Sequence, residues 1–325
     1  MKRTAIITGM TGQDGPYLAR FLLERDYHVY GLVKRYSNPN LDNLAWLGID
    51  KDVELVTGDI TDDSMINNLV RTIKPQEFYN LAAQSFVGAS WELNKLTTEV
   101  NAMGPLNILN AIKMHSSTTK FYQASTSEMY GNSDGSQQNE STPFHPRSPY
   151  GVSKLYGHWI TVNYRESYGL YACSGILFNH ESPLRGREFV TRKVTDAVAR
   201  IRLGLADSVT LGNLDARRDW GFAGDFVEAM YLMLQQPEAR DYVIATGQQH
   251  TIGDLCRVAF EHVGIQDWQG LIRTDPRFKR PAELHSLCGD SSRARDLLGW
   301  RPRVDFDSMI RSMVDADLAR LQPRQ

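Results

Sequence analysis

A tyrosine and a lysine four residues apart, Tyr150 and Lys154, follow a short polar run, Ser125-Thr126-Ser127-Glu128, in this chain. Side chains at that spacing lie on one face of a helix. The ammonium of Lys154 can favour the phenolate of Tyr150 and so make it a base near neutral pH. Such a base suits removal of a hydroxyl proton while hydride leaves the same carbon. We therefore predict that both residues are catalytic and lie beside a hydride acceptor.

Glu128 supplies a second, independent proton acceptor. Oxidation of an alcohol does not require one, so the pair of bases indicates chemistry beyond simple dehydrogenation. Each feature also has a plainer interpretation. The Tyr–Lys spacing occurs on solvated helices, Thr126 and Ser127 can cap a turn after a strand, and Glu128 can be an exposed loop acid. The elements around these residues decide between the interpretations.

Three glycines near the N-terminus have the spacing G-x-x-G-x-x-G. A β-rich apolar run at 4–8 precedes them and a helical pattern from Tyr17 follows, whereas isolated glycine triplets are often only turns. Glycines let the backbone approach a pyrophosphate, and the start of a helix holds its charge. We predict a dinucleotide site here, formed by Gly9, Thr11, Gly12, Gln13, Asp14 and Gly15.

The second predicted strand, 28–33, ends in Lys34 and Arg35 without an acidic residue. An Asp or Glu at this position would bind the ribose 2′-hydroxyl of NAD, whereas Arg accommodates the 2′-phosphate of NADP. We therefore predict NADP as the cofactor, with Arg35 as a contact. The alternative is that Lys34 and Arg35 are solvated loop charges.

Strand and helix patterns alternate along the first half of the chain. Further strands are predicted at 53–57, 77–81 and 120–124, separated by amphipathic segments such as 63–73 and 100–114. This alternation is typical of an α/β fold, a Rossmann-type doubly wound parallel sheet, here with a smaller α/β substrate-binding lobe. Ligands bind beyond the carboxyl ends of such strands. We expect Gly9, Asp59, Ala82 and Ser125, which lie at those ends, to converge on one crevice.

Composition limits the remaining possibilities. The 325 residues are 42% hydrophobic and 23% charged with a net charge of −2, which suits a compact enzyme and not a nucleic-acid-binding protein. No apolar stretch approaches the ~20 residues of a membrane span. The chain runs directly into its first strand, so we expect no signal peptide. The three cysteines match no metal or disulfide spacing, which favours reduced thiols, a cytoplasmic location and no metal site.

Several motifs resemble those of the GDP-mannose 4,6-dehydratase family, within the extended short-chain dehydrogenase/reductases. The resemblance covers nearly the whole chain, and the T-S-E triplet and the F-N-H-E-S-P-L-R run are its most specific parts. The segments that carry it are GMTGQDG at 9–15, NLAAQSFV at 80–87, ASTSEMYG at 124–131, YGVSK at 150–154, FNHESPLR at 178–185 and RDWG at 218–221.

The resemblance implies a lyase reaction without net redox change, in which GDP-mannose gives GDP-4-dehydro-6-deoxy-mannose and water. It implies that Tyr150 deprotonates the 4-hydroxyl while hydride passes from C4 to NADP⁺, and that Lys154 holds the nicotinamide ribose. Thr126 would hydrogen-bond the C4 oxygen. Glu128 would remove the C5 proton and help the C6 hydroxyl to leave, after which hydride returns to C6.

The resemblance also implies two further sets of binding residues. Besides the glycine motif, Tyr150 and Lys154, the cofactor contacts would be Arg35, Asp59, Ile60, Leu81, Ala82, Ala83, Gln84, Ser85, His180 and Arg185. The GDP-sugar contacts would be Ser85, Thr126, Glu128, Asn179, Lys193, Arg218, Arg280 and Glu283. Residues 1–178 and about 219–249 would form the NADP-binding domain, and about 179–218 and 250–325 the substrate-binding lobe.

Some alternatives stay open at this level. A GDP-manno-heptose would present the same reaction centre, so the sugar is not fixed. An NADP-dependent nucleotide-sugar epimerase or 4-keto reductase would keep Tyr150 and Lys154, but an epimerase acting only at C4 would not need Glu128. A non-catalytic NADP-binding module would have no reason to keep all four residues. The family expectation is a homodimer or homotetramer, and the run Lys34-Arg35-Tyr36 departs from the family's adjacent arginines on a loop between subunits.

Overall fold

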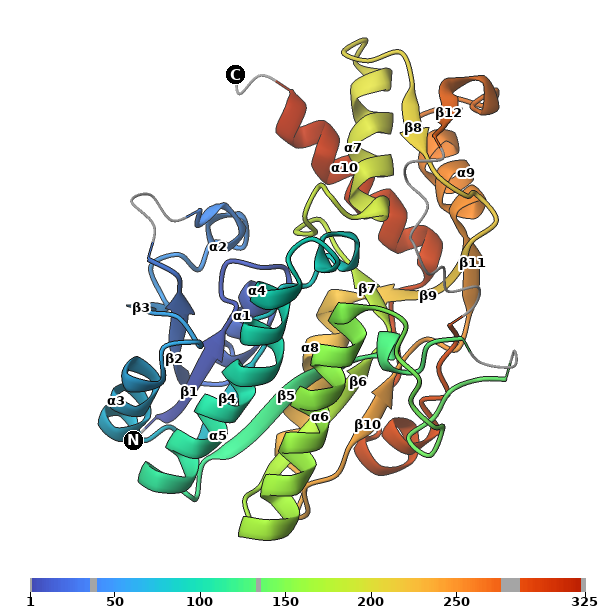
Figure 1. Ribbon diagram of the computed structural model, residues 1–325. Coiled ribbons are helices and arrows are strands. Elements are labelled where there is room, and N and C mark those ends of the chain that lie inside the picture. The colour runs from blue at the N-terminus through green and yellow to red at the C-terminus, as the bar shows by residue number, and fades with distance from the viewer. Residues whose placement is uncertain (1, 36–39, 133–135, 276–286, 323–325) are drawn as a thin grey trace.

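One parallel sheet forms the centre of the molecule (Figure 1). The computed structural model describes residues 2–35, 40–132, 136–275 and 287–322. Seven strands lie in the order β10-β6-β5-β4-β1-β2-β3, and all six pairings are parallel. Their bounds are Arg3–Thr8 (β1), Tyr27–Val33 (β2), Glu54–Thr57 (β3), Glu77–Asn80 (β4), Lys120–Thr126 (β5), Ala172–Leu177 (β6) and Tyr242–Ile244 (β10). The predicted Rossmann-type doubly wound sheet is confirmed.

Helices cover both faces of this sheet. Successive residues of β1 show the two layers, because Ile7 packs into the core beneath α1 and α8 while Ile6 packs into the core beneath α3, α5 and α6. The helices are Asp14–Leu23 (α1), Asp42–Trp46 (α2), Asp63–Ile73 (α3), Asn94–Thr98 (α4), Gly104–His115 (α5), Pro149–Tyr168 (α6) and Ala223–Leu234 (α8). The segment predicted as one helix at 100–114 is a π-helical turn, Glu99–Met103, followed by α5.

A second, smaller lobe lies beyond the carboxyl ends of the central strands (Figure 1). It has its own apolar core around Val194, Trp220, Phe260 and Met313. Its strands are Asn179–Glu181 (β7), Val209–Leu211 (β8), Arg217–Phe222 (β9), Gln249–Thr251 (β11) and Ile272–Thr274 (β12), and its helices are Val190–Arg202 (α7), Ile252–His262 (α9) and Phe306–Leu321 (α10).

The chain passes between the two lobes more than once. After β9 it forms α8 and then β10, which joins the central sheet beside β6. The lobe bounds given above stay a prediction. Within the described residues, none of the helices has the length and apolar character needed to cross a membrane.

Candidate functional site

A cavity of 1120 Å³ lies between the two lobes, at the carboxyl ends of β1, β4, β5 and β6. This volume exceeds the usual range for one drug-sized ligand, so it has room for two extended molecules. Thr126, Glu128, Tyr150 and Lys154 all line it. The predicted cofactor residues also line it, with the exception of Arg35. Of the predicted substrate contacts, Ser85, Asn179, Lys193 and Arg218 line it, and Arg280 and Glu283 lie outside the described residues.

Arg35 is exposed and does not line the cavity, whereas its neighbour Lys34 does. The ammonium of Lys34 pairs with the carboxylate of Asp59, with 3.1 Å between Nζ and Oδ2. Of the two cations after β2, Lys34 is therefore the one that lines the cavity. The sequence identified both residues at the end of β2, but strand geometry decides which one turns inward.

The glycine turn forms a close-fitting cradle after β1. Gly9 has φ +72°, and a Cβ there would come within 2.9 Å of the Leu81 carbonyl carbon and the Ala82 nitrogen. A Cβ at Gly15 would lie 2.7 Å from the Gly9 oxygen. The first turn of α1 starts directly after this turn and carries free backbone N–H groups. The residues present therefore fit a dinucleotide pyrophosphate.

A chain of buried side chains fixes the loop after β4. The Thr8 hydroxyl donates to Asn80 Oδ1 at 2.7 Å and accepts from the backbone N–H groups of Leu81 and Ala82. Asn80 in turn donates to Gln123 of β5 at 2.8 Å. These contacts hold the loop that carries the predicted cofactor residues 81–85 against the ends of β1 and β5.

Capping positions the predicted catalytic side chains. The Thr126 hydroxyl, at the end of β5, accepts from the backbone N–H of Glu128 at 3.2 Å and starts a short 3₁₀ turn, Ser127–Met129. Ser148 caps α6 by accepting from the Gly151 N–H at 3.0 Å, with Pro149 in the first turn. Tyr150 therefore lies in the first turn of α6, beside Thr126. The turn after β5 and the start of α6 place both predicted bases in one cavity.

Burial dominates the electrostatics of Tyr150 and Lys154. It raises the pKa of Tyr150 to about 12, although the hydrogen bond from Thr126 acts in the opposite direction. Burial also lowers the pKa of Lys154 to about 8. Lys154 Nζ donates to the Ala124 carbonyl at 2.9 Å and lies 5.9 Å from the centre of the Tyr150 ring. This differs from the sequence expectation, because the protein alone does not lower the Tyr150 pKa through Lys154.

The run at 178–185 connects the glycine turn to the second lobe. His180 hydrogen-bonds the Phe178 carbonyl through Nδ1 and lies 2.9 Å from Asp14 Oδ2 through Nε2. Burial opposes a charged imidazole, yet Asp14 holds the pKa of His180 above its usual value. Ser182 donates to Gln13 Oε1 at 2.9 Å. The sequence prediction placed His180 near the cofactor, and its partner Asp14 belongs to the predicted cofactor turn.

Arg185 is held by the second lobe. Its Nε pairs with Glu181 at 3.0 Å, and its guanidinium lies 3.5 Å over the Phe189 ring. Arg192 donates to the Pro183 and Arg185 carbonyls and forms a buried ion pair with Asp317 of α10. Neither Arg192 nor Asp317 lines the cavity, so Arg192 holds the loop carbonyls from outside it.

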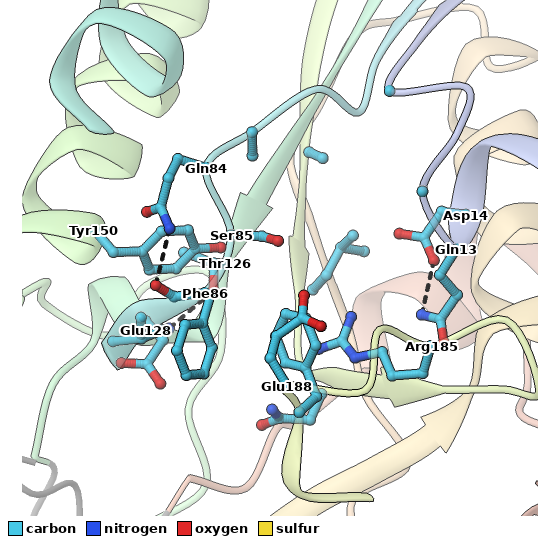
Figure 2. A pocket seen from close by; sticks show the side chains of 18 of the residues that line it. Gln13, Asp14, Gln84, Ser85, Phe86, Thr126, Glu128, Tyr150, Arg185 and Glu188 are labelled. Carbon is cyan, nitrogen blue, oxygen red and sulfur yellow. Dashed lines mark hydrogen bonds between the residues drawn. The ribbon is translucent and has the colours of Figure 1, made fainter. Parts of the chain in front are cut away.

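The cavity also has aromatic walls that sequence reasoning missed. Phe86 contacts Phe189 edge to face, with ring centres 5.8 Å apart, and so joins the loop after β4 to the start of α7. Trp91 and Trp220 line the cavity as well. Figure 2 shows Phe86 between the Glu128 and Glu188 side chains in that view. Phe86 directly follows Ser85 in the segment 80–87, which resembles a family motif. That position was the one sign in the sequence that Phe86 could line the site.

Lys193 and Arg218 bring positive charge to the second-lobe wall. Arg218 lies on β9 and is only 9% exposed, and Lys193 lies on α7. Burial lowers the pKa of Lys193, although Asp275 opposes that shift. Next to Arg218, the buried carboxylate of Asp219 accepts from Thr246, Gly247 and Gly289 and so fixes β9. Two cations opposite the glycine cradle suit a second, anionic ligand.

Comparison with known proteins gives consistent matches over nearly the whole chain. Residues 6–313 match the family described as GDP-mannose 4,6 dehydratase. GDP-mannose 4,6 dehydratase 1 of Arabidopsis thaliana is 50% identical over 98% of this chain and 90% of the relative. The human GDP-mannose 4,6 dehydratase is 46% identical over 98% and 92%. The solved dTDP-glucose 4,6-dehydratase of Streptomyces venezuelae, with NAD bound, has TM-score 0.86 and 25% identity over 96% of both chains.

Proposed function

Because this chain belongs to the GDP-mannose 4,6-dehydratase family, we propose that it is a hydro-lyase that converts GDP-mannose to GDP-4-dehydro-6-deoxy-mannose and water. The observation that carries the proposal is the convergence of Thr126, Glu128, Tyr150 and Lys154 on one cavity that also contains the glycine cradle. Glu128 distinguishes this reaction from epimerisation at C4, which needs no second base.

A nicotinamide cofactor fits the glycine cradle, and a related solved structure holds NAD. When bound, the nicotinamide supplies the hydride acceptor and later the hydride donor. We propose NADP specifically, because Lys34 and Arg35 follow β2 and no acidic residue stands at its end. Backbone N–H groups of the glycine turn would hold the pyrophosphate, and the Lys154 ammonium would hold the nicotinamide ribose.

Tyr150 and Thr126 would act on the C4 oxygen. Thr126 hydrogen-bonds the Tyr150 side chain, so the two hydroxyls can share one substrate oxygen, with Tyr150 as the proton acceptor. With a pKa of about 12, the phenol of Tyr150 is protonated at neutral pH and cannot accept a proton. A positive charge next to the phenol favours its ionised form, and the oxidised nicotinamide ring carries such a charge. Tyr150 therefore acts as a base only in the assembled complex.

Glu128 would serve the elimination. A ketone at C4 makes the C5 proton acidic, and a carboxylate can take that proton and then give one to the departing C6 hydroxyl. Glu128 lies two residues after Thr126 and lines the same cavity, which supports this role. Arg218, Lys193 and Asn179 would bind the GDP diphosphate from the second lobe, with Arg280 on phosphate and Glu283 on ribose hydroxyls.

We further propose that the protein is a cytoplasmic homo-oligomer formed through the outer faces of α5 and α6. Large apolar side chains are exposed on these faces, which single soluble chains rarely show as a group. They are Met114 on α5 and Val152, Tyr156 and Trp159 on α6, with Met103 directly before α5. Dimer and tetramer remain alternatives.

The proposal is tested by incubating the protein, loaded with NADP, with a panel of nucleotide sugars that includes GDP-mannose and GDP-manno-heptose. We expect a product from GDP-mannose that has lost one water, detected by mass spectrometry, without added reductant and without accumulation of free NADPH. Tyr150→Phe is the negative control. Stoichiometric NADPH release would indicate a dehydrogenase, and an unchanged mass with altered sugar configuration would indicate an epimerase.

A further inference from the structure

Three residues on one face of α6 contact the last three residues of β5. Tyr150, Lys154 and His158 follow one another at four-residue spacing and are all buried. Tyr150 meets Thr126, and Lys154 donates to the Ala124 carbonyl. His158 Nδ1 lies 3.2 Å from Ser125 Oγ and shares a hydrogen bond with it. The catalytic face of α6 therefore has a third member, which the proposed chemistry does not use.

The end of β5 needs this support. Its pairing with β4 stops at Gln123, opposite Asn80, whereas its pairing with β6 continues to Thr126. Beyond Gln123 the strand is therefore held by a neighbouring strand on one side only. Ser125 is 3% exposed and lines the cavity between Ala124 and the catalytic Thr126. The contact with His158 restrains the residue whose backbone leads directly into Thr126.

His158 lies in an aromatic pocket. Its ring packs edge to face against Phe144 and Trp159, with centres 5.2 and 5.5 Å apart, and it is 4% exposed. Burial lowers the pKa of His158, and the nearby Asp241 and Arg165 act in opposite directions. A neutral imidazole has one donor and one acceptor nitrogen, so it can bond a hydroxyl without carrying charge into the site.

We propose that His158 is a positioning residue for this reaction. By holding the Ser125 hydroxyl it fixes the end of β5 and directs the Thr126 hydroxyl toward Tyr150. His158 itself does not line the cavity. The effect on turnover rests on the proposed function. The His158–Ser125 bond does not, because it is present in the protein alone.

Two substitutions at this position separate positioning from packing. His158→Asn keeps a hydrogen-bonding atom near the place of Nδ1 on a smaller side chain. His158→Phe fills the ring volume between Phe144 and Trp159 but cannot bond Ser125. We expect kcat for GDP-mannose to fall about five- to tenfold in His158→Phe, with KM changed less than about twofold, and kcat of His158→Asn to stay within about threefold of the parent. The opposite order, with Phe near the parent and Asn impaired, would mean that His158 only packs.

Ser125→Ala removes the same hydrogen bond from its other end. We expect the same fall in kcat as in His158→Phe, and no further loss when the two are combined, because both remove one bond. The matched control is Tyr164→Phe, which removes the hydrogen bond from Tyr164 to Asn110 further along α6 and should leave kcat within about twofold. Additive losses in the double variant would overturn the proposal.

Nitrogen-15 NMR of the histidines tests the bond without any turnover. In the NADP-loaded protein, Ser125→Ala should shift the Nδ1 resonance of His158 and leave those of the other histidines unchanged. If the Nδ1 resonance of His158 does not move in Ser125→Ala, the proposed role of His158 is contradicted, even if the parent enzyme is active. If the resonance shifts but the parent protein does not dehydrate GDP-mannose, the His158–Ser125 bond is supported and the proposed function is contradicted.

Discussion

The ammonium of Lys154 lies 5.9 Å from the centre of the Tyr150 ring and donates to the carbonyl of Ala124 instead of to the phenol oxygen. The two residues share one face of α6, as their spacing requires, yet each is affected mainly by its own burial. Lys154 therefore links α6 to β5 and stays available to a ligand in the cavity. In the proposed mechanism, Tyr150 therefore depends on Thr126 and on a bound positive charge for its activation.

The burial of Lys154 makes a prediction about stability. Its folded pKa, about 8, lies below the unfolded value, so between about pH 8 and 10.4 the unfolded chain binds more protons and stability rises with pH. Below pH 8 the buried charge is a cost. Lys154→Met should therefore raise the free energy of unfolding at pH 7 by about 1 to 2 kcal/mol, after loss of the Ala124 bond, while abolishing turnover. Urea unfolding at pH 7 and pH 9.5 measures this, and the advantage should shrink at the higher pH.

Glu128→Gln should separate oxidation from elimination. The amide cannot accept the C5 proton, so the variant should form NADPH transiently on mixing with GDP-mannose and release no dehydrated product. Tyr150→Phe should fail at the earlier oxidation and show no NADPH absorbance. Rapid-mixing absorbance, with deuterium exchange at C5 in D₂O, distinguishes the two. Dehydration by Glu128→Gln at near the parent rate would remove Glu128 from the mechanism.

Removal of Arg218 should weaken nucleotide-sugar binding selectively. A lost charge-assisted contact costs ~1.5 to 3 kcal/mol, so we expect the GDP-mannose Kd of Arg218→Ala to rise about 10- to 100-fold and the NADP Kd to change little. Lys193→Ala should behave in the same way. The control is Arg217→Ala on the same strand, because Arg217 is exposed and does not line the cavity. Calorimetric titration that gave equal losses for both ligands would indicate general destabilisation.

The two cations after β2 can be ranked by how much each contributes to binding of NADP over NAD. Lys34 lines the cavity and Arg35 is exposed outside it. If NADP is the cofactor, Lys34→Ala should raise the Kd of NADP by about tenfold and leave that of NAD nearly unchanged. Arg35→Ala should have a smaller effect of the same kind. A parent protein that prefers NAD in equilibrium binding would contradict both expectations.

A charge on the exposed face of α6 should break the proposed oligomer. Tyr156 is 43% exposed and lies among the apolar residues of that face. Tyr156→Glu should reduce the mass measured by sedimentation to that of one chain. Leu205→Glu, at an exposed apolar position in the second lobe, is the control and should keep the parent mass. Unchanged mass in Tyr156→Glu would place any interface elsewhere.

Local patterns in the sequence predicted most of the fold. Alternating apolar strands and amphipathic helices are set by periodicity within short windows, so five of the seven strands of the sheet were identified with bounds shifted by one or two residues. The π-helical turn at Glu99–Met103 was not predicted from the same periodicity, because such turns are rare local insertions within helices.

The sequence by itself determined the chemistry that this protein can carry: two bases, a glycine cradle and cations for a diphosphate are matters of residue type and spacing. Only the tertiary structure decided which of these groups face one another. In the folded protein, Lys34 lines the cavity and Arg35 does not. Lys154 donates a hydrogen bond to a carbonyl of β5, and His158 hydrogen-bonds Ser125. These outcomes depend on where a strand ends and on how deeply a side chain is buried, and both are set by contacts between residues far apart in the sequence.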